Sequence, residues 1–384
     1  MNAKPTFIIV GAGIGGLTVA IALRQAGFGV KAFERARELK EIGAGIGLSA
    51  NAIRVLQRLG VMQQVIDRGT VIKELVSYSC KGEILGHVPT TRTEVPSVCL
   101  HRADLQEALF SASPLDHIHL AEEFVRFKAA DGRVTAHFAS GRSESAHALI
   151  GADGLQSRVR AQLIGDGEPT YRGYLCWRGV CDYPAAERLT ESFGQGLRMG
   201  LVPIGRRGTA WWCTANQTLG ADRDRAEIKS KLQGWFGKWH PPIPEVLSRT
   251  DPAAIIQTAI CDRRPVTTWS KGTCTLLGDA AHPTTPNLGQ GGCMAIEDAA
   301  MLARCASNDA DLSIAFRSYE RLRFARTARV MTLSRYYGVI GQWRNPALVW
   351  LRNTALRITP ARAAAKSYDR FVSYDPWNVS LNEG

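Results

Sequence analysis

Three glycine-rich segments are the parts of this sequence best suited to chemistry, because each could bring the backbone close to a phosphate or a ring. In the first, Gly11, Gly13 and Gly16 form GxGxxG between an apolar run (6–10) and a helical pattern that closes at Gly27. The first glycine allows a tight turn, the second a close approach to a pyrophosphate, and the third close helix–strand packing. Free amides at the helix start favour phosphate. The segment therefore predicts a dinucleotide site.

An acidic residue follows this motif at the spacing that ribose recognition requires. Glu34 ends the second apolar run, which begins at Val30, about 20 residues after the glycines. A carboxylate at this position can accept hydrogen bonds from both ribose hydroxyls. The nucleotide is therefore predicted to carry a free 2′-hydroxyl, as FAD and NAD do and NADP does not.

Two further Gly-Asp segments distinguish FAD from NAD. One is GADG at 151–154, and the other is GDAAHP at 278–283, which continues into PNLGQGG at 286–292. With GxGxxG, in this order and at this spacing, the chain resembles the FAD-dependent aromatic-hydroxylase family, the single-component flavoprotein monooxygenases. The resemblance covers residues 6–345. PNLGQGGCMAIEDA is especially similar to the urate hydroxylase, salicylate hydroxylase and zeaxanthin epoxidase branches.

The resemblance implies FAD as cofactor and a role for each matching position. Arg102 is expected near the ribityl chain and phosphates, and the backbone of Val125 near the adenine. Asp153, with Gly154, would link the FAD and nicotinamide regions, and Asp279 would bind a ribityl hydroxyl. The predicted cofactor-binding set is Gly11, Gly13, Ile14, Gly15, Gly16, Glu34, Arg35, Gly45, Arg102, Val125, Asp153, Gly154, Asp279, Pro286, Gly289, Gly291, Gly292 and Cys293.

The chemistry of a reduced flavin gives an independent reason to place residues 286–293 beside the flavin ring. Reduced flavin is an anion, and the amides of Gly291, Gly292 and Cys293 open a long helix whose positive end can stabilise it. A flavin hydroperoxide also needs a dry, close-walled cavity. Pro286 is predicted to form one wall of that cavity.

The substrate side carries weaker signals. Residues 171–217 are rich in Trp, Tyr, Cys and Val and predict antiparallel strands. The predicted catalytic and pocket residues are Pro286, Arg178, Arg198 and Trp212, with either arginine binding a carboxylate or phenolate. One of the adjacent Trp211 and Trp212 should point inward. Some relatives that act on hydroxylated pyridines have a His where this chain has Gly47, so an already ionised or a larger apolar substrate is favoured over base-assisted phenol hydroxylation.

Two other features concern His282 and the reductant. We interpret His282 as structural, because no acidic partner lies near it in sequence.

The chain has no second GxGxxG. NADPH or NADH is therefore predicted to bind transiently, aided by Arg158, Arg160 and the basic stretch 317–370.

The charge of the chain is concentrated in that stretch. The net charge is +12, and residues 317–370 hold 12 basic and two acidic side chains, a net +10. No nucleic-acid motif accompanies the charge, so nucleic acid is not predicted as a partner. Within it, PALVWLRNTALRITP mixes Arg with apolar residues at helical spacing. It could lie on a membrane, but the flanking Pro346 and Pro360 favour a short helix packed on its own domain.

Composition restricts the class of protein further. The 384 residues, 45% hydrophobic, predict a globular fold. The nine cysteines form no CxxC pair, so we predict reduced thiols and no metal site. No apolar run reaches the roughly 18 residues of a membrane span, and the N-terminus does not resemble a signal peptide. A cytoplasmic protein is predicted, either monomer or homodimer.

The fold class that follows is mixed α/β: a Rossmann-like βαβ FAD-binding domain interleaved with an antiparallel-sheet substrate domain, then C-terminal helices. The predicted FAD domain comprises 1–72, 99–170 and 262–345, and the substrate domain 73–98 and 171–261. Residues 346–384 form the C-terminal helical segment.

The predicted function is NAD(P)H- and O2-dependent hydroxylation of an aromatic or heteroaromatic small molecule through a flavin C4a-hydroperoxide. Epoxidation of a larger isoprenoid or polyene is the alternative. An oxygen-independent flavin reductase and a non-catalytic FAD-binding protein are further alternatives. Halogenation is disfavoured because the WxWxIP signature is absent.

Overall fold

A six-stranded sheet carries the glycine-rich segments. The computed structural model describes residues 4–39, 43–113, 117–184, 186–220 and 225–381. All neighbouring strands of this sheet are parallel except the antiparallel pair β18–β19. The order is β18 (Ser270–Lys271), β19 (Cys274–Leu276), β12 (Ala148–Gly151), β1 (Thr6–Val10), β2 (Gly29–Phe33) and β8 (Ile118–His119).

The register of this sheet aligns the ends of four strands. Val10 pairs with both Phe33 and Gly151, and Gly151 pairs with Leu276. The carboxyl ends of β1, β2, β12 and β19 therefore meet at one edge. Open parallel sheets bind ligands at this edge.

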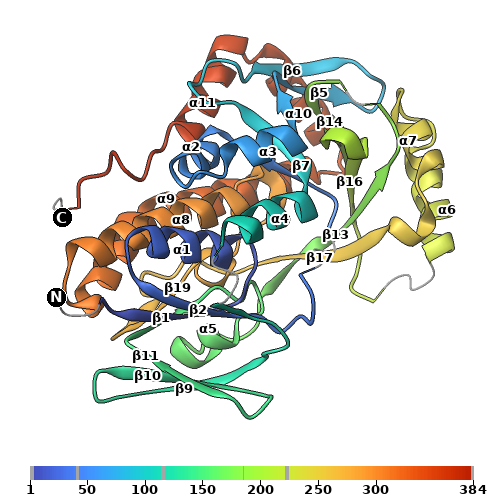
Figure 1. Ribbon diagram of the computed structural model, residues 1–384. Coiled ribbons are helices and arrows are strands. Elements are labelled where there is room, and N and C mark those ends of the chain that lie inside the picture. Colours follow the sequence, from blue (N-terminus) through green and yellow to red (C-terminus); the bar gives the residue numbers. More distant parts are fainter. Residues whose placement is uncertain (1–3, 40–42, 114–116, 185, 221–224, 382–384) are drawn as a thin grey trace.

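Helices and a small sheet cover the two faces of the parallel sheet. Leu17, Ile21 and Ile296, from two of the helices, are buried in its core. On one side lie α1 (Ile14–Gln25), α8 (Gly291–Asn308) and α9 (Leu312–Gly341) (Figure 1). On the other lie α5 (Arg158–Leu163) and an antiparallel sheet of β9 (Phe124–Ala130), β10 (Arg133–Phe138) and β11 (Ser143–Ala146) (Figure 1).

A seven-stranded sheet forms the second layer, antiparallel except for the parallel pair β14–β5. Trp177 and Trp211 pack with α6 (Arg225–Phe236) and α7 (Ile243–Arg249), whereas Tyr174 and Cys176 lie in a separate cluster with Trp212. Strand alternation explains this division. The sheet order is β17 (Ile256–Asp262), β13 (Thr170–Cys181), β16 (Thr209–Asn216), β15 (Leu197–Pro203), β14 (Arg188–Phe193), β5 (Glu74–Ser79) and β6 (Ile84–Pro89).

The remaining elements join the two layers and cover their ends. An antiparallel sheet combines β3 (Gly45–Leu48), β7 (Ser97–His101) and β4 (Thr70–Ile72). The other helices are α2 (Ala50–Arg58), α3 (Met62–Arg68), α4 (Arg102–Ala112), α10 (Pro346–Ile358) and α11 (Ala361–Val372). The fold is thus the mixed α/β class predicted, while the domain boundaries stay a prediction.

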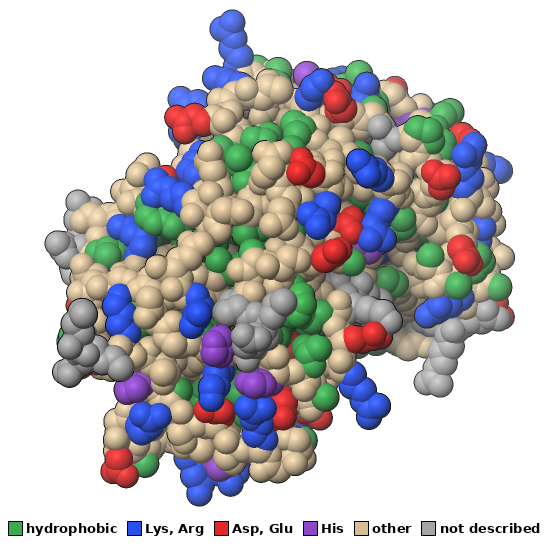
Figure 2. Space-filling model, viewed as in Figure 1, with side chains coloured by type: hydrophobic (Ala, Val, Ile, Leu, Met, Phe, Trp, Pro, Cys, Tyr) green, Lys and Arg blue, Asp and Glu red, His purple; other side chains and the backbone are tan. Residues whose placement is uncertain are grey.

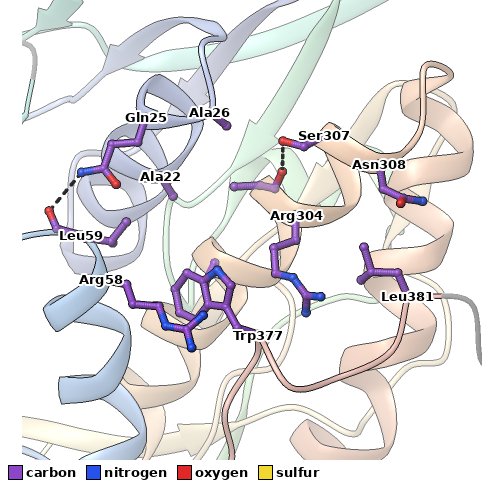
Figure 3. Close-up of a pocket in the computed structure, with 12 residues that line it drawn as sticks. Ala22, Gln25, Ala26, Arg58, Leu59, Arg304, Ser307, Asn308, Trp377 and Leu381 are labelled. Carbon is purple, nitrogen blue, oxygen red and sulfur yellow. Dashed lines mark hydrogen bonds between the residues drawn. The ribbon is translucent and has the colours of Figure 1, made fainter.

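The chain after α11 returns across the ends of three helices. There it lines a surface cavity of about 480 Å³ with residues of α1, α2 and α8. The Arg58 guanidinium lies 4.5 Å from the centre of the Trp377 ring (Figure 3). Arg304 donates to the carbonyls of Pro376 and Val379. The cavity lining includes none of the predicted cofactor-binding residues.

Two surface findings bear on the predicted partners. On the face in Figure 2, basic and acidic side chains are interspersed. Within the described part of the chain, no helix combines the length and apolar character needed to cross a bilayer.

Candidate functional site

The GxGxxG turn has the geometry that its glycines require. Gly11 has φ +101°, and a Cβ there would lie 2.5 Å from the Ala152 carbonyl oxygen. A Cβ on Gly16 would lie 1.9 Å from the Gly11 carbonyl oxygen. A Cβ on Gly13 would meet no atom within 4 Å. Two glycines therefore close the turn, and the third leaves open space beside the backbone.

Glu34 binds the same turn from the end of β2. Its carboxylate accepts hydrogen bonds from the Ala12 amide at 2.9 Å and from the Ala36 amide at 3.0 Å. From the sequence, Glu34 was predicted to bind the ribose, whereas its hydrogen bonds to these two backbone amides were not predicted. The carboxylate lies beside the turn, as a ribose ligand would have to.

Asp153 and Asp279 follow the ends of β12 and β19. Asp153 accepts hydrogen bonds from the Ser157 hydroxyl at 2.5 Å and the Val159 amide at 3.2 Å, and burial raises the pKa of its carboxyl. Asp279 is exposed between buried neighbours. An ideal Cβ on Gly291 would lie 3.7 Å from an Asp279 carboxylate oxygen. Asp279 is therefore available to a ligand beside α8, whereas Asp153 is occupied with the first turn of α5 and its N-cap Ser157.

The N-termini of α1 and α8 lie close together. A Cβ on Gly15 would lie 3.3 Å from the Cβ of Ala295 in the second turn of α8. Neither helix has a side-chain cap or an acidic residue in its first turn. The first amides of each helix lack intrahelical acceptors, and each end carries partial positive charge. Two positive helix ends thus serve one region, which suits phosphates and an anionic ring.

The segment before α8 leaves room next to it. Pro286 and Gly289 are exposed, while Thr285 and Gln290 are buried. Cys293 is buried, and desolvation raises the pKa of its thiol to about 12, so it stays neutral. These features fit a bound ring whose wall is formed by backbone and Pro286.

Other predicted cofactor residues lie around this edge. Gly45 lies where β3 meets the seven-stranded sheet, because a Cβ there would lie 2.9 Å from Ala210. Arg102 begins α4, and its side chain lies 2.7 Å from the ideal Cβ of Gly43. Arg35 is exposed after β2, and Val125 in β9 is 48% exposed. Their roles toward FAD stay predictions.

A buried charge network lies behind the Asp279 segment. Asp298 in α8 accepts hydrogen bonds from the Gly278 amide at 3.0 Å, His282 Nε2 at 2.5 Å and Arg323 Nε at 2.6 Å. The structural interpretation of His282 agrees with its 1% exposure. Our reason was wrong, however, because the acidic partner lies one element further along the chain.

A second chain of contacts reaches the start of α8. Arg323 and Arg326 of α9 both pair with Glu297, at 2.7 and 2.5 Å. The side-chain amide nitrogen of Asn51 donates to a carboxylate oxygen of Glu297 at 2.5 Å and to the side-chain oxygen of Gln290 at 3.0 Å. Since Gln290 is the N-cap of α8, α9 fixes the helix end that the ring would contact.

Arg160 corrects the prediction for the reductant. It is 1% exposed, pairs with Asp166 at 2.6 Å, and donates to the carbonyls of Ala280 and Ala281 at 2.9 and 2.6 Å. It therefore holds the Asp279 segment and has no surface for NAD(P)H. Arg158 is exposed and pairs with Glu123 at 2.6 Å.

The predicted substrate arginines have different surroundings. Arg198 is fully buried and donates to Glu191 at 3.1 Å, Gln342 at 3.0 Å and Asn287 at 2.7 Å. It thereby connects the seven-stranded sheet to the segment before α8. Arg178 is half-buried and donates to Thr258 at 3.3 Å.

An aromatic wall surrounds Arg198. Its guanidinium lies 5.6 Å from the Trp212 ring and 5.9 Å from the Tyr174 ring. The Tyr174 hydroxyl accepts from Asn287 at 3.0 Å. Trp211 is buried under α6 and α7, so Trp212 is the tryptophan that faces this side of the sheet.

Sequence reasoning missed Asn287, Glu191, Asp298 and Arg323. Burial raises the pKa of the Glu191 carboxyl, although Arg198 and Tyr337 oppose the shift. Charged residues lie at otherwise apolar positions of 291–308 and 312–341. Such a pattern could have predicted buried ion pairs between α8 and α9. Among the described residues, no cluster of His, Cys, Asp or Glu could hold a metal ion.

The Asp298 contacts predict acid sensitivity. Burial alone would raise the pKa of its carboxyl, but His282 and Arg323 outweigh burial and lower the pKa from 3.8 to about 2. The contribution of about 2 kcal/mol is therefore complete above about pH 5 and is lost as the pH falls toward 2, with about 1 kcal/mol lost between about pH 6 and about pH 3. Urea unfolding at about pH 6 and about pH 3 would measure it. Asp298→Asn should lose less stability over this interval than the parent, whereas Asp131→Asn in an exposed turn should match the parent.

The comparisons with known proteins concern the family and the fold. The family described as FAD binding domain matches residues 4–332. The chain is 40% identical to aurachin C monooxygenase/isomerase of Stigmatella aurantiaca, over 98% of this chain and 100% of that protein. It is 30% identical to 6-hydroxynicotinate 3-monooxygenase of Bordetella bronchiseptica, over 87% of this chain and 91% of that protein.

A solved structure has the same fold over nearly the whole chain. It is Klebsiella pneumoniae HpxO complexed with FAD and uric acid, with a TM-score of 0.92 and 27% identity. The match covers 97% of this chain and 98% of that one.

Proposed function

This chain belongs to the FAD binding domain family and is an FAD-dependent monooxygenase, and we propose that it hydroxylates an aromatic or heteroaromatic small molecule. NADH or NADPH is the proposed reductant and O2 the co-substrate. One observation carries the proposal: Gly13, Glu34 and Asp279 follow strands whose carboxyl ends are aligned at one sheet edge, where two helices begin without a side-chain cap.

The proposed cofactor contacts follow from the chemistry of each group. The α1 amides and Gly13 would bind the pyrophosphate, Glu34 the ribose and Asp279 a ribityl hydroxyl. The α8 amides at 291–293 would hold the negative charge of the reduced ring. Bound FAD would supply hydride acceptance from NAD(P)H and oxygen activation.

The proposed substrate side combines an aromatic wall with a neutralised arginine. Trp212 and Tyr174 would pack against a flat ring and keep water away from it. Arg198 is already paired with Glu191 and Asn287. We therefore propose that Arg198 positions Asn287 beside the ring. Arg178 stays a candidate for contact with an anionic substrate.

The first experiment is oxidation of NADH and NADPH by the purified yellow protein in air. Hydroxylated aromatic acids, phenols, N-heterocycles and polyenes would be added one at a time, with peroxide quantified in parallel. Stimulation by an aromatic compound with little peroxide supports the proposal. Stimulation by polyenes alone would favour epoxidation. A protein that binds FAD but is reduced by neither nucleotide would refute it.

Replacing Trp212 with alanine is expected to uncouple the reaction. Opening the wall admits water and loosens the substrate, so KM should rise about tenfold and more NAD(P)H should end as peroxide. Oxygen and peroxide electrodes would measure both. Trp235→Ala is the matched control, because Trp235 packs on the α6 side of the sheet, 5.6 Å from the Trp177 ring. If both variants produce the same fraction of peroxide per NAD(P)H oxidised, Trp212 does not line the substrate pocket.

A further inference from the structure

Helix α10 exposes four large apolar side chains and buries one of its two arginines. Arg352 is 3% exposed, whereas Leu348, Trp350, Leu351 and Ile358 are 40%, 68%, 51% and 72% exposed. Leu348, Leu351 and Ile358 are three and seven residues apart, which places them on one helix face. A surface helix normally shows the opposite arrangement, with its apolar stripe toward the core.

Arg352 fixes this orientation. Its guanidinium donates to the Gly341 and Gly194 carbonyls, each at 3.1 Å, and lies 5.0 Å from the Phe193 ring. Burial and the neighbouring charge of Arg198 lower its pKa to about 10, so it stays charged at neutral pH. Rotating the helix to bury its leucines would leave this charge without partners, at a large cost. The apolar face is therefore held outward by the fold itself.

The neighbouring surface is basic. Helix α11 exposes Arg362, Lys366 and Arg370. Arg344 is exposed just before α10, and Arg357 is exposed in the last turn of α10. Between 344 and 370 the chain has six basic residues and one acidic residue. Both helices pack on β6 at the edge of the seven-stranded sheet (Figure 1).

The strand β6 extends the apolar part of this surface. Ile84 at its start is 60% exposed, and the preceding Glu83 pairs with Arg357 at 3.2 Å. We call the whole the α10–α11 surface. It comprises Ile84, Arg344, Leu348, Trp350, Leu351, Arg357, Ile358, Arg362, Lys366 and Arg370.

We propose that the α10–α11 surface docks on an anionic lipid bilayer. Its apolar side chains would enter the boundary between headgroups and acyl chains, with Trp350 at the headgroup level. Its arginines and lysine would meet lipid phosphates. With 13 residues, α10 is shorter than the roughly 20 needed to span a bilayer, so it would lie in the interface plane.

Charge argues against a second copy of the chain as the occupant. A twofold interface brings the same patch of both copies together. Five exposed basic residues would then face five others, and the neighbouring acidic side chains, Glu83 and Asp369, are already paired with Arg357 and Arg92. An anionic membrane complements both the apolar and the basic part.

The test is co-sedimentation of the FAD-loaded full chain with vesicles of phosphatidylcholine alone or mixed with phosphatidylglycerol. Wild type should bind the anionic vesicles, with salt weakening the binding. Leu348→Ser, Leu351→Ser and Ile358→Ser combined should lower the bound fraction about tenfold. Arg362→Gln with Lys366→Gln should weaken binding to anionic vesicles only.

Matched controls separate this surface from general basic attraction. Ile314→Ser changes another exposed apolar residue, 44% exposed on α9. Arg126→Gln with Lys128→Gln removes two exposed charges from β9. Both should bind like wild type. Equal binding by the triple α10 variant, or no binding by wild type, would overturn the proposal.

A spectroscopic measurement keeps the test valid if the triple variant fails to fold. Brominated phosphatidylglycerol should quench part of the tryptophan fluorescence of wild type, and Trp350→Phe should remove that part. Quenching unchanged by Trp350→Phe would overturn the proposal. Sedimentation without lipid gives the remaining outcome: a dimer that the triple variant converts to monomer would assign the surface to a second copy.

Discussion

Adding a methyl group at Gly13 is expected to weaken FAD binding about 10- to 100-fold while leaving the fold intact. The position has φ −73°, which alanine adopts, and a Cβ there meets no protein atom within 4 Å. It would occupy the space that the pyrophosphate needs and remove the equivalent of one charge-assisted hydrogen bond, worth about 1.5–3 kcal/mol. FAD titration by fluorescence would measure the loss.

Gly16 is the matched control for this substitution. Its added Cβ would lie 1.9 Å from the Gly11 carbonyl oxygen, so the backbone of the turn would have to move. Gly16→Ala should lower the free energy of unfolding by about 3 kcal/mol or more, even without FAD. Thermal unfolding of the FAD-free proteins would separate the two effects. A Gly13→Ala protein that keeps full FAD affinity would place the pyrophosphate elsewhere.

Replacing Arg323 with methionine is expected to lower the free energy of unfolding by about 3–5 kcal/mol. Arg323, Glu297 and Asp298 are each fully buried, and the arginine pairs with both carboxylates at 2.6–2.7 Å. Methionine fills similar volume but leaves two buried negative charges with fewer partners. Urea unfolding near neutral pH would measure the change.

The same substitution should weaken FAD binding, because Asp298 holds the amide of Gly278 and the ring of His282. Arg329→Met is the control, an exposed arginine on the same helix, and should change stability by less than about 0.5 kcal/mol. A loss below about 1 kcal/mol for Arg323→Met would mean that the carboxylates find other partners.

These predictions bring together residues that lie far apart in the sequence. Arg160 precedes by 120 positions the Ala280 carbonyl that it binds, and Asn51 precedes by 246 positions the Glu297 that it contacts. No local pattern connects such pairs. These long-range contacts hold the Asp279 segment and the start of α8 in place.

Local sequence patterns are enough to predict the parallel sheet edge and its glycines. A strand, a tight turn and a helix depend on local backbone requirements, so Gly11, Gly16 and Glu34 could be placed from spacing alone. Strand alternation likewise required the adjacent Trp211 and Trp212 to point to opposite faces, because that period is a property of the strand itself.

Which charged groups pair and which faces are covered depends on the tertiary structure. In the structure Arg160 is buried, and His282 pairs with an acidic residue. Arg198 is buried and donates to Asn287, and the leucines of α10 are exposed whereas Arg352 is buried. Burial and ion pairing depend on side chains from segments far apart in the sequence. The hydrophobic periodicity of one segment therefore cannot predict them.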